Sequence, residues 1–159
     1  GLFKGKKNII CEEELVDEHA LDTAIDLFNQ LEMHTLFMDP AEHDKHMAYV
    51  SHLSHVSSFM LGMTVLDIEK DVKQITNLAS TGFESTVRLA KSSAETWTSI
   101  FVNNSEDLST ALGVYIDYLK DFKQKLDKKD SKGIKKYLIS ANKIKRALKG
   151  MKHNILKLS

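Results

Sequence analysis

A single proline, Pro40, restricts the fold of this 159-residue chain more than any other feature. Proline inside a helix removes a backbone hydrogen bond and kinks the axis. No proline follows Pro40, so no later helix is interrupted in this way. Asp39 can cap a helix, Pro40 fits its first position, and Glu42 stands three residues after the cap. Apolar residues then recur at helical spacing. We therefore predict a mainly α fold from residue 39 onward.

The apolar spacing predicts a first helix that runs from Asp39 to about Leu66. Its buried stripe would consist of Met47, Val50, Leu53, Phe59 and Leu61. Further patterns predict helices over about 67–78, 83–89, 94–101, 105–126 and 131–149. Ser80-Thr81-Gly82 indicates a break, at which Gly82 would supply a backbone conformation that residues with a Cβ resist. Helices this amphipathic usually bury their faces against one another or against a second copy.

Residues 1–38 differ from the rest of the chain. Short apolar runs at 8–11 and 34–38 predict two strands, and the segment between them, from Asp17 to Leu31, has a helical pattern. A strand–helix–strand unit cannot form a stable sheet alone. We therefore predict two parts: residues 1–38 as the end of a larger α/β domain, and residues 39–159 as an all-helical domain. The chain contains no glycine-rich dinucleotide loop and no P-loop.

The zero net charge hides a strong asymmetry. Residues 1–119 contain 8 Lys/Arg against 19 Asp/Glu, whereas residues 120–159 contain 14 against 3. A basic tail can favour nucleic acid or an anionic membrane. We expect neither partner, because no aromatic residues interleave the basic ones. The apolar runs are also too short for a transmembrane helix. The lone cysteine, Cys11, excludes an intrachain disulfide and fits a reducing compartment, so we expect a cytoplasmic protein.

Four histidines, His43, His46, His52 and His55, interrupt the apolar pattern of the first helix. His52 and His55 are three residues apart and share a helix face with apolar neighbours. A polar pair in such a stripe needs a partner, which can be protein, water or ligand. The plainer explanations are surface exposure for His43 and His46 and a satisfied core pair for His52 and His55. The Glu-x-x-His and His-Glu-x-x-His patterns of metal sites are absent, so we expect no metal.

Two further residues are candidates for a binding site. Arg88 is the only arginine before Arg146, and its planar guanidinium suits two-pronged binding of a carboxylate. Its plainer explanation is a surface salt bridge to Glu84, one turn earlier. Trp97 is the only tryptophan, and such a residue either packs in the core or lines a ligand pocket.

Several blocks of this chain, in order and at the right spacing, resemble the carboxy-terminal part of prephenate dehydrogenases. The sequence LFKGK at 2–6 followed by NII at 8–10 is similar to a late strand of the family's nucleotide domain. DPAEHD at 39–44 and VSHLSH at 50–55 resemble the family's Asp-Pro-x-x-His-Asp and Ser-His-Leu-Pro-His signatures. LASTGF at 78–83, RLA at 88–90, Ser92 and Trp97 resemble its Gly-Gly-Phe…Thr-Arg-Ile-Ala…Ser-Asp-Pro…Trp block.

The resemblance implies a helical domain that dimerises and closes over the active site beside a Rossmann domain. The implied reaction is the oxidative decarboxylation of prephenate to 4-hydroxyphenylpyruvate with NAD or NADP as cofactor. By the same resemblance Arg88 binds a substrate carboxylate, and the other substrate-binding residues are His52, His55, Trp97 and Gly82. The general-base histidine would belong to the nucleotide domain. We therefore expect a homodimer, no catalytic residue in this chain, and neither bound cofactor nor activity for the chain alone.

The chain departs from the family pattern at several positions that shape the pocket. Ser54 replaces the proline between the two histidines, Thr81 the first glycine, Val87 the threonine before the arginine, and Ser93-Ala94 an Asp-Pro pair. Arogenate is therefore a second possible substrate, because it differs from prephenate only in an amino in place of a keto group. A non-enzymatic helical interaction module and a histidine-rich metal-binding bundle are also compatible with the sequence.

Overall fold

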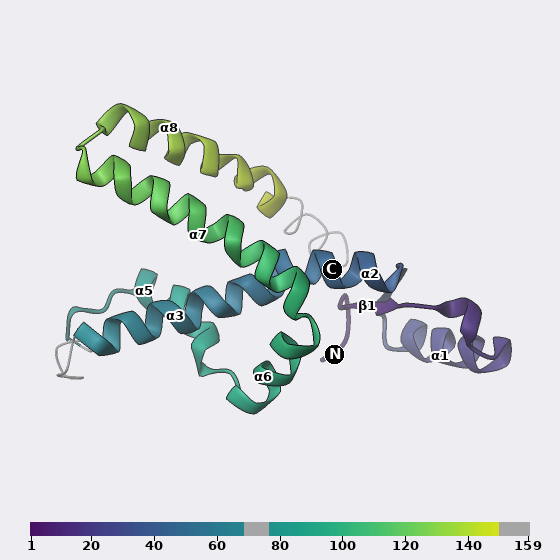
Figure 1. Ribbon diagram of the computed structural model, residues 1–159. Helices are drawn as coiled ribbons and strands as arrows, with labels where there is room; N and C mark the ends of the chain where they lie inside the picture. Colours follow the sequence, from purple (N-terminus) through teal and green to yellow (C-terminus); the bar gives the residue numbers. More distant parts are fainter. Residues whose placement is uncertain (69–76, 150–159) are drawn as a thin grey trace. The chain divides into compact units, whose positions relative to one another are not determined.

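The computed structural model describes residues 1–68 and 77–149 and shows a mainly helical chain with one two-stranded sheet (Figure 1). Contacts divide it into two compact units. Residues 41–115 form one unit, and the described parts of 1–40 and 116–159 form the other. No helix in the described ranges is both long and apolar enough to cross a membrane.

The beginning of the chain folds as the predicted strand–helix–strand unit. Strands β1 (Lys7–Ile10) and β2 (His34–Phe37) pair in parallel, and helix α1 (Glu18–Gln30) connects them. A parallel pair needs such a crossover because its strands run in the same direction. The side chain of Asp17 caps α1 by accepting a hydrogen bond of 3.0 Å from the amide of Ala20. A short 3₁₀ turn, η1, comes before this cap at Glu13–Leu15.

The predicted first helix consists of three pieces rather than one. Helix α2 (Pro40–Met47) begins at the proline as expected. A π-helical segment, η2 (Ala48–His52), then joins it to α3 (Leu53–Ile68). A π segment adds a residue to the turn, so the positions that face inward change.

The predicted apolar stripe is therefore wrong. Val50 is 69% exposed, and the side chains of this region that are buried are small or polar. Within the described residues, the buried set is Ala48, His52, Ser58, Asn104, Leu108 and Ala111. All six belong to the unit of residues 41–115, so half of its small core is polar.

Gly82 does not have the backbone role that the sequence suggested. Helix α5 (Thr81–Val87) begins before Gly82, which lies in its first turn, and a 3₁₀ turn, η3 (Arg88–Lys91), follows. A Cβ at Gly82 would meet only Ser80 Oγ, at an ordinary 3.6 Å. The predicted break is present at 79–80, but the chain makes it through extended backbone at Ser80, so the role predicted for Gly82 is wrong. Most of the predicted helix 67–78 lies outside the described residues.

Helices α6 (Ala94–Asn103), α7 (Ser105–Asp127) and α8 (Ser131–Ala141) follow. Side chains cap the first turns of α6 and α8. The side chain of Ser93 accepts from the amide of Thr96, and that of Asp130 from the amide of Gly133.

The last predicted helix has the expected extent but is interrupted. Helix α8 gives way after Ala141 to a 3₁₀ turn, η4 (Asn142–Ile144), and residues 145–149 are helical again, so the periodicity from 131 to 149 does not correspond to one regular helix. Its predicted end at Gly150 lies outside the described residues. The second half of α7 and α8 run antiparallel (Figure 1), joined by contacts of Tyr137 with Tyr118, Asp121 and Phe122.

Candidate functional site

The structure brings three of the predicted site residues together. The ring of His55 stacks on Trp97 with a centroid distance of 3.3 Å and an interplanar angle of 20°. His52 meets the same indole edge-on, at 6.1 Å and 77°. Phe101, one turn further along α6, lies 5.4 Å from Trp97. The prediction that both histidines share one face is confirmed, and that face packs against α6.

A residue that the sequence did not single out, Asn104, completes this arrangement. It lies between α6 and α7 and is 9% exposed. Its side-chain amide donates to the main-chain oxygen of Asp44 at 2.8 Å and contacts Nδ1 of His52 at 3.2 Å. We call His52, His55, Trp97 and Asn104 the histidine cluster. It joins the end of the π segment and the start of α3 to the junction of α6 and α7.

The hydrogen bond from Asn104 defines the proton on His52. An amide nitrogen only donates, so Nδ1 of His52 has to accept, and the ring proton is left on Nε2. Burial lowers the pKa of His52 below its ordinary value of 6.5, and the Asp44 carboxylate acts in the opposite direction. The imidazole is therefore neutral at pH 7 and offers an N–H donor.

His55 carries the opposite tautomer when neutral. Its Nδ1 lies 3.1 Å from the main-chain oxygen of Ser51, which can only accept, so this nitrogen carries the proton. Nε2 of His55 is then an acceptor. When both rings are neutral, the two histidines provide one donor and one acceptor beside the indole of Trp97, and this is an arrangement suited to a polar ligand.

Arg88 lies at the start of a turn that packs on the same helix as His55. Ser58, 1% exposed on α3, accepts a hydrogen bond of 3.0 Å from the amide of Ala90 in η3. A Cβ at Gly62, one helical turn along α3, would lie 3.8 Å from the Cβ of Ala90. Small residues on α3 thus let the η3 backbone approach closely and fix the turn that begins with Arg88.

The guanidinium of Arg88 is exposed and does not form the salt bridge to Glu84 that was its plainer explanation. Within residues 1–68 and 77–149 it has no ion-pair partner at all. Neither Arg88 nor Gly82 contacts the histidine cluster by a hydrogen bond or ion pair among the described residues. An unpaired arginine beside a helix with polar, oriented groups is available to an anionic ligand.

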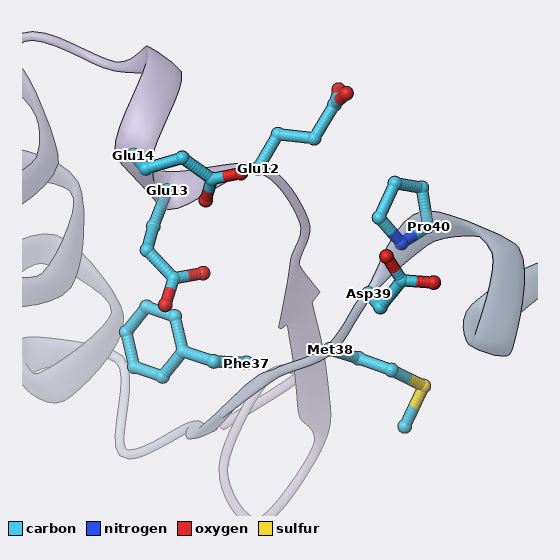
Figure 2. Close-up of a pocket in the computed structure, with 7 residues that line it drawn as sticks. All are labelled: Glu12, Glu13, Glu14, Phe37, Met38, Asp39 and Pro40. Atoms are coloured by element: carbon cyan, nitrogen blue, oxygen red, sulfur yellow. The ribbon is translucent and has the colours of Figure 1, made fainter.

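A separate pocket lies in the other unit, at the carboxyl ends of β1 and β2 (Figure 2). It has a volume of about 310 Å³. Its lining consists of Glu12, Glu13, Glu14, Phe37, Met38, Asp39 and Pro40. Four carboxylates and no cation line this pocket, so it would repel a dicarboxylate or a phosphate. The sequence shows the three consecutive glutamates, but it does not show that the chain folds Asp39 next to them.

No three His, Cys, Asp or Glu side chains gather as metal ligands in the part of the chain that the structure describes. His46 is exposed, which agrees with its plainer explanation. His43 is partly buried instead, and its Nδ1 lies 2.9 Å from the carboxylate of the neighbouring Asp44.

Comparison with known proteins agrees with the resemblance over most of the chain. Residues 39–140 match the family model described as prephenate dehydrogenase, dimerization domain. The prephenate dehydrogenase of Lactococcus lactis subsp. cremoris is 28% identical over 123 residues, which are 77% of this chain and 35% of that protein. The chain thus spans about a third of the length of this curated relative.

Two solved structures have the same fold. The prephenate dehydrogenase from A. aeolicus, in complex with hydroxyphenyl propionate and NAD⁺, superposes with a TM-score of 0.77 at 26% identity, over 92% of this chain and 51% of that one. Arogenate dehydrogenase from Synechocystis superposes with a TM-score of 0.74 at 24% identity, over 92% and 54%. The family match includes every member of the histidine cluster and Arg88. This chain therefore belongs to the family of prephenate dehydrogenase dimerization domains.

Proposed function

We propose that this chain is the dimerisation and substrate-closing part of a prephenate dehydrogenase, which converts prephenate to 4-hydroxyphenylpyruvate and CO₂ with NAD(P)⁺ as oxidant. The observation that carries the proposal is the histidine cluster on α3 and α6 with an unpaired arginine on the adjacent turn η3. Family membership and the A. aeolicus complex support the same reaction.

The proposed roles follow from the charges and donors in the site. Prephenate is a dicarboxylate, and the guanidinium of Arg88 can hold one carboxylate through two parallel hydrogen bonds. The Nε2–H of His52 and the Nε2 acceptor of His55 would orient oxygen atoms of the ligand, and Trp97 would give the ring an apolar side. Gly82, in the first turn of α5, would allow close approach of the ligand to the backbone.

The dinucleotide does not fit the residues of this chain. No glycine-rich turn follows β1, and the pocket at the strand ends is lined by carboxylates that would repel a pyrophosphate. In our proposal residues 1–38 are the end of a nucleotide domain that binds NAD(P)⁺ and supplies the general-base histidine. The boundary at 38/39 is supported by the start of the family match at residue 39. We place this enzyme in the cytoplasm.

A homodimer is part of the proposal. The family description names a dimerization domain, and the second half of the chain leaves many large apolar side chains uncovered. On α7 and α8 they include Val114, Ile116, Leu119, Leu126, Leu138 and Ile139. A second copy would bury such a surface. Sedimentation at micromolar concentration should give a dimer, and a monomer would contradict this part of the proposal.

The reaction is tested by NAD⁺ and NADP⁺ reduction in the full-length protein, with prephenate and arogenate offered separately. We expect turnover with prephenate and formation of 4-hydroxyphenylpyruvate and CO₂. The 159-residue chain alone should show no turnover with either substrate. Turnover by the chain alone, or no turnover by the full-length protein with either substrate, would overturn the proposal.

Arogenate is the second candidate substrate. The superposition on an arogenate dehydrogenase supports it, and the proposed arginine–carboxylate contact is common to both substrates. A higher kcat/KM with arogenate than with prephenate would assign the chain to that reaction.

A further inference from the structure

Asn104 occupies a position that neither the family description nor the proposed roles explain. It is 9% exposed, and its amide connects α2, the π segment and the α6–α7 junction. We propose that Asn104 is a positioning residue that holds His52 as the neutral Nε2–H tautomer, so that the substrate meets a hydrogen-bond donor without added charge. The substrate half of this inference rests on the function proposed above.

The geometry of the amide requires this tautomer. The main-chain oxygen of Asp44 accepts one N–H of the Asn104 amide at 2.8 Å, and this contact establishes which end of the amide carries the nitrogen. The second N–H of the same nitrogen is directed to Nδ1 of His52 at 3.2 Å. A proton on Nδ1 would place two donors against each other, so Nδ1 stays bare and Nε2 carries the proton.

The charges around His52 show why such a device is useful. Asp44 favours the imidazolium, whereas burial and the nearby His43 and His55 disfavour it. An amide donor at Nδ1 also disfavours the imidazolium, as burial, His43 and His55 do. Within the described residues, no other group takes a hydrogen bond from Nε2 of His52. The ring therefore keeps a donor for a ligand, and the recognition of negative charge is left to Arg88.

The first test measures the tautomer in this chain directly. Two-bond ¹H–¹⁵N spectra of ring-labelled histidine should show His52 with a bare Nδ1 and a protonated Nε2, which titrates below the ordinary range. Asn104→Asp keeps the shape of the side chain but replaces the donor with an acceptor. It should move the proton to Nδ1 and raise the pKa of His52. Asn103→Ala, which removes an exposed amide next to it, should change neither.

The second test measures the consequence in the full-length enzyme. Asn104→Ala should raise KM for the dicarboxylate about tenfold, as expected for one misdirected hydrogen bond to a charged ligand, and should leave KM for NAD⁺ unchanged. In Asn104→Asp, KM should also become dependent on pH across the shifted titration of His52. Asn103→Ala should match the wild type.

The outcomes separate the two proposals. A wild-type spectrum with the proton on Nδ1 of His52 overturns the role of Asn104 without the need for any variant to fold. A tautomer that changes in Asn104→Asp while KM stays constant overturns the positioning role. The full-length protein could show the expected tautomers and yet turn over neither prephenate nor arogenate. That result would overturn only the proposed function, and Asn104 would still hold the tautomer of His52.

Discussion

Two polar clusters between helices of this molecule show how the site that we propose for a ligand differs from a structural contact. The histidine cluster lies between α3, α6 and the start of α7. The second cluster, which we call the hairpin trio, consists of Asp121, Lys125 and Tyr137 on α7 and α8. In the trio the Asp121 carboxylate accepts from Lys125 at 2.5 Å and from the hydroxyl of Tyr137, and the ammonium lies 4.7 Å from the Tyr137 ring.

The hairpin trio is closed, whereas the histidine cluster is open. Hydrogen bonds from Lys125 and Tyr137 lower the pKa of Asp121, and the same carboxylate raises the pKa of Tyr137. Each polar group of the trio thus has its partner inside it. In the other cluster, Nε2 of His52 and the nearby Arg88 have no such partner among the described residues. A hydrogen-bond donor and a positive charge without partners, next to aromatic rings, distinguish the site that we propose for a ligand from the hairpin trio.

The largest effect that tests this comparison is expected from Arg88→Ala in the full-length enzyme. Loss of two charge-assisted hydrogen bonds should raise KM for the dicarboxylate about 100-fold. KM for NAD⁺ should change by less than about twofold, because we propose that a separate nucleotide domain binds it. Steady-state kinetics with each substrate varied in turn measure both constants.

Lys91→Ala is the matched control, since Lys91 is an exposed cation at the other end of η3. It should leave both constants unchanged. Equal and small effects of the two variants would place Arg88 among ordinary surface charges, and the comparison would then rest on Nε2 of His52 alone.

The second prediction concerns how η3 is held on α3. Ser58→Ala removes the acceptor for the amide of Ala90 and should lower the free energy of unfolding by about 1–2 kcal/mol. Ser57→Ala is the control, because the Ser57 hydroxyl donates to the carbonyl of Leu53 in its own helix and has no other hydrogen bond among the described residues. Denaturant titration of both variants measures the difference. Equal losses would mean that the Ser58–Ala90 contact adds nothing specific to the position of Arg88.

The third prediction is the pH dependence of stability that comes from His52. Its pKa is lower in the folded chain than in the unfolded chain, so the unfolded chain binds more protons between the two values. The contribution of His52 to the free energy of unfolding is therefore fully present above a pH of about 6.5, and it decreases as the pH falls towards the pKa of the folded chain. Denaturant midpoints of unfolding, measured at pH 8, 6.5 and 5, should decrease with falling pH in the wild type. They should decrease less in His52→Gln. Identical slopes would mean that burial of His52 does not oppose its protonation.

The sequence predicted the parts of this molecule that depend on local signals. The helix starts next to Asp17, Ser93 and Asp130 were predicted from such signals, and at each start the side chain accepts from an amide three residues later. The pairing of His52 and His55 on one face followed from their spacing. Membership of the family followed from the order of several short blocks, each of which is modest alone.

The parts that were missed depend on contacts between distant residues. Asn104 bonds to residues 60 and 52 positions away, and the Ser58–Ala90 bond joins residues 32 apart. An asparagine between two helices is typical of a cap, so nothing local indicated its contact with His52. The π segment η2 likewise changed the inward face of the helix, and periodicity assumes a constant turn. This is why the predicted stripe was wrong. The prediction for His52 and His55 was confirmed, because after His52 the chain continues as the regular helix α3.

The smallest effect is expected in the hairpin trio. Tyr137→Phe removes the hydroxyl that Asp121 accepts but keeps the ring contacts with Tyr118 and Phe122. Because the carboxylate keeps Lys125 and lies at the surface, Tm should fall by only about 1–2 °C. KM for the dicarboxylate should stay at the wild-type value, because a closed cluster offers nothing to a ligand. Thermal unfolding and kinetics on the same variant measure the two quantities. A clear rise in KM with little change in Tm would contradict the comparison, since it would show that the trio, and not only the histidine cluster, takes part in binding.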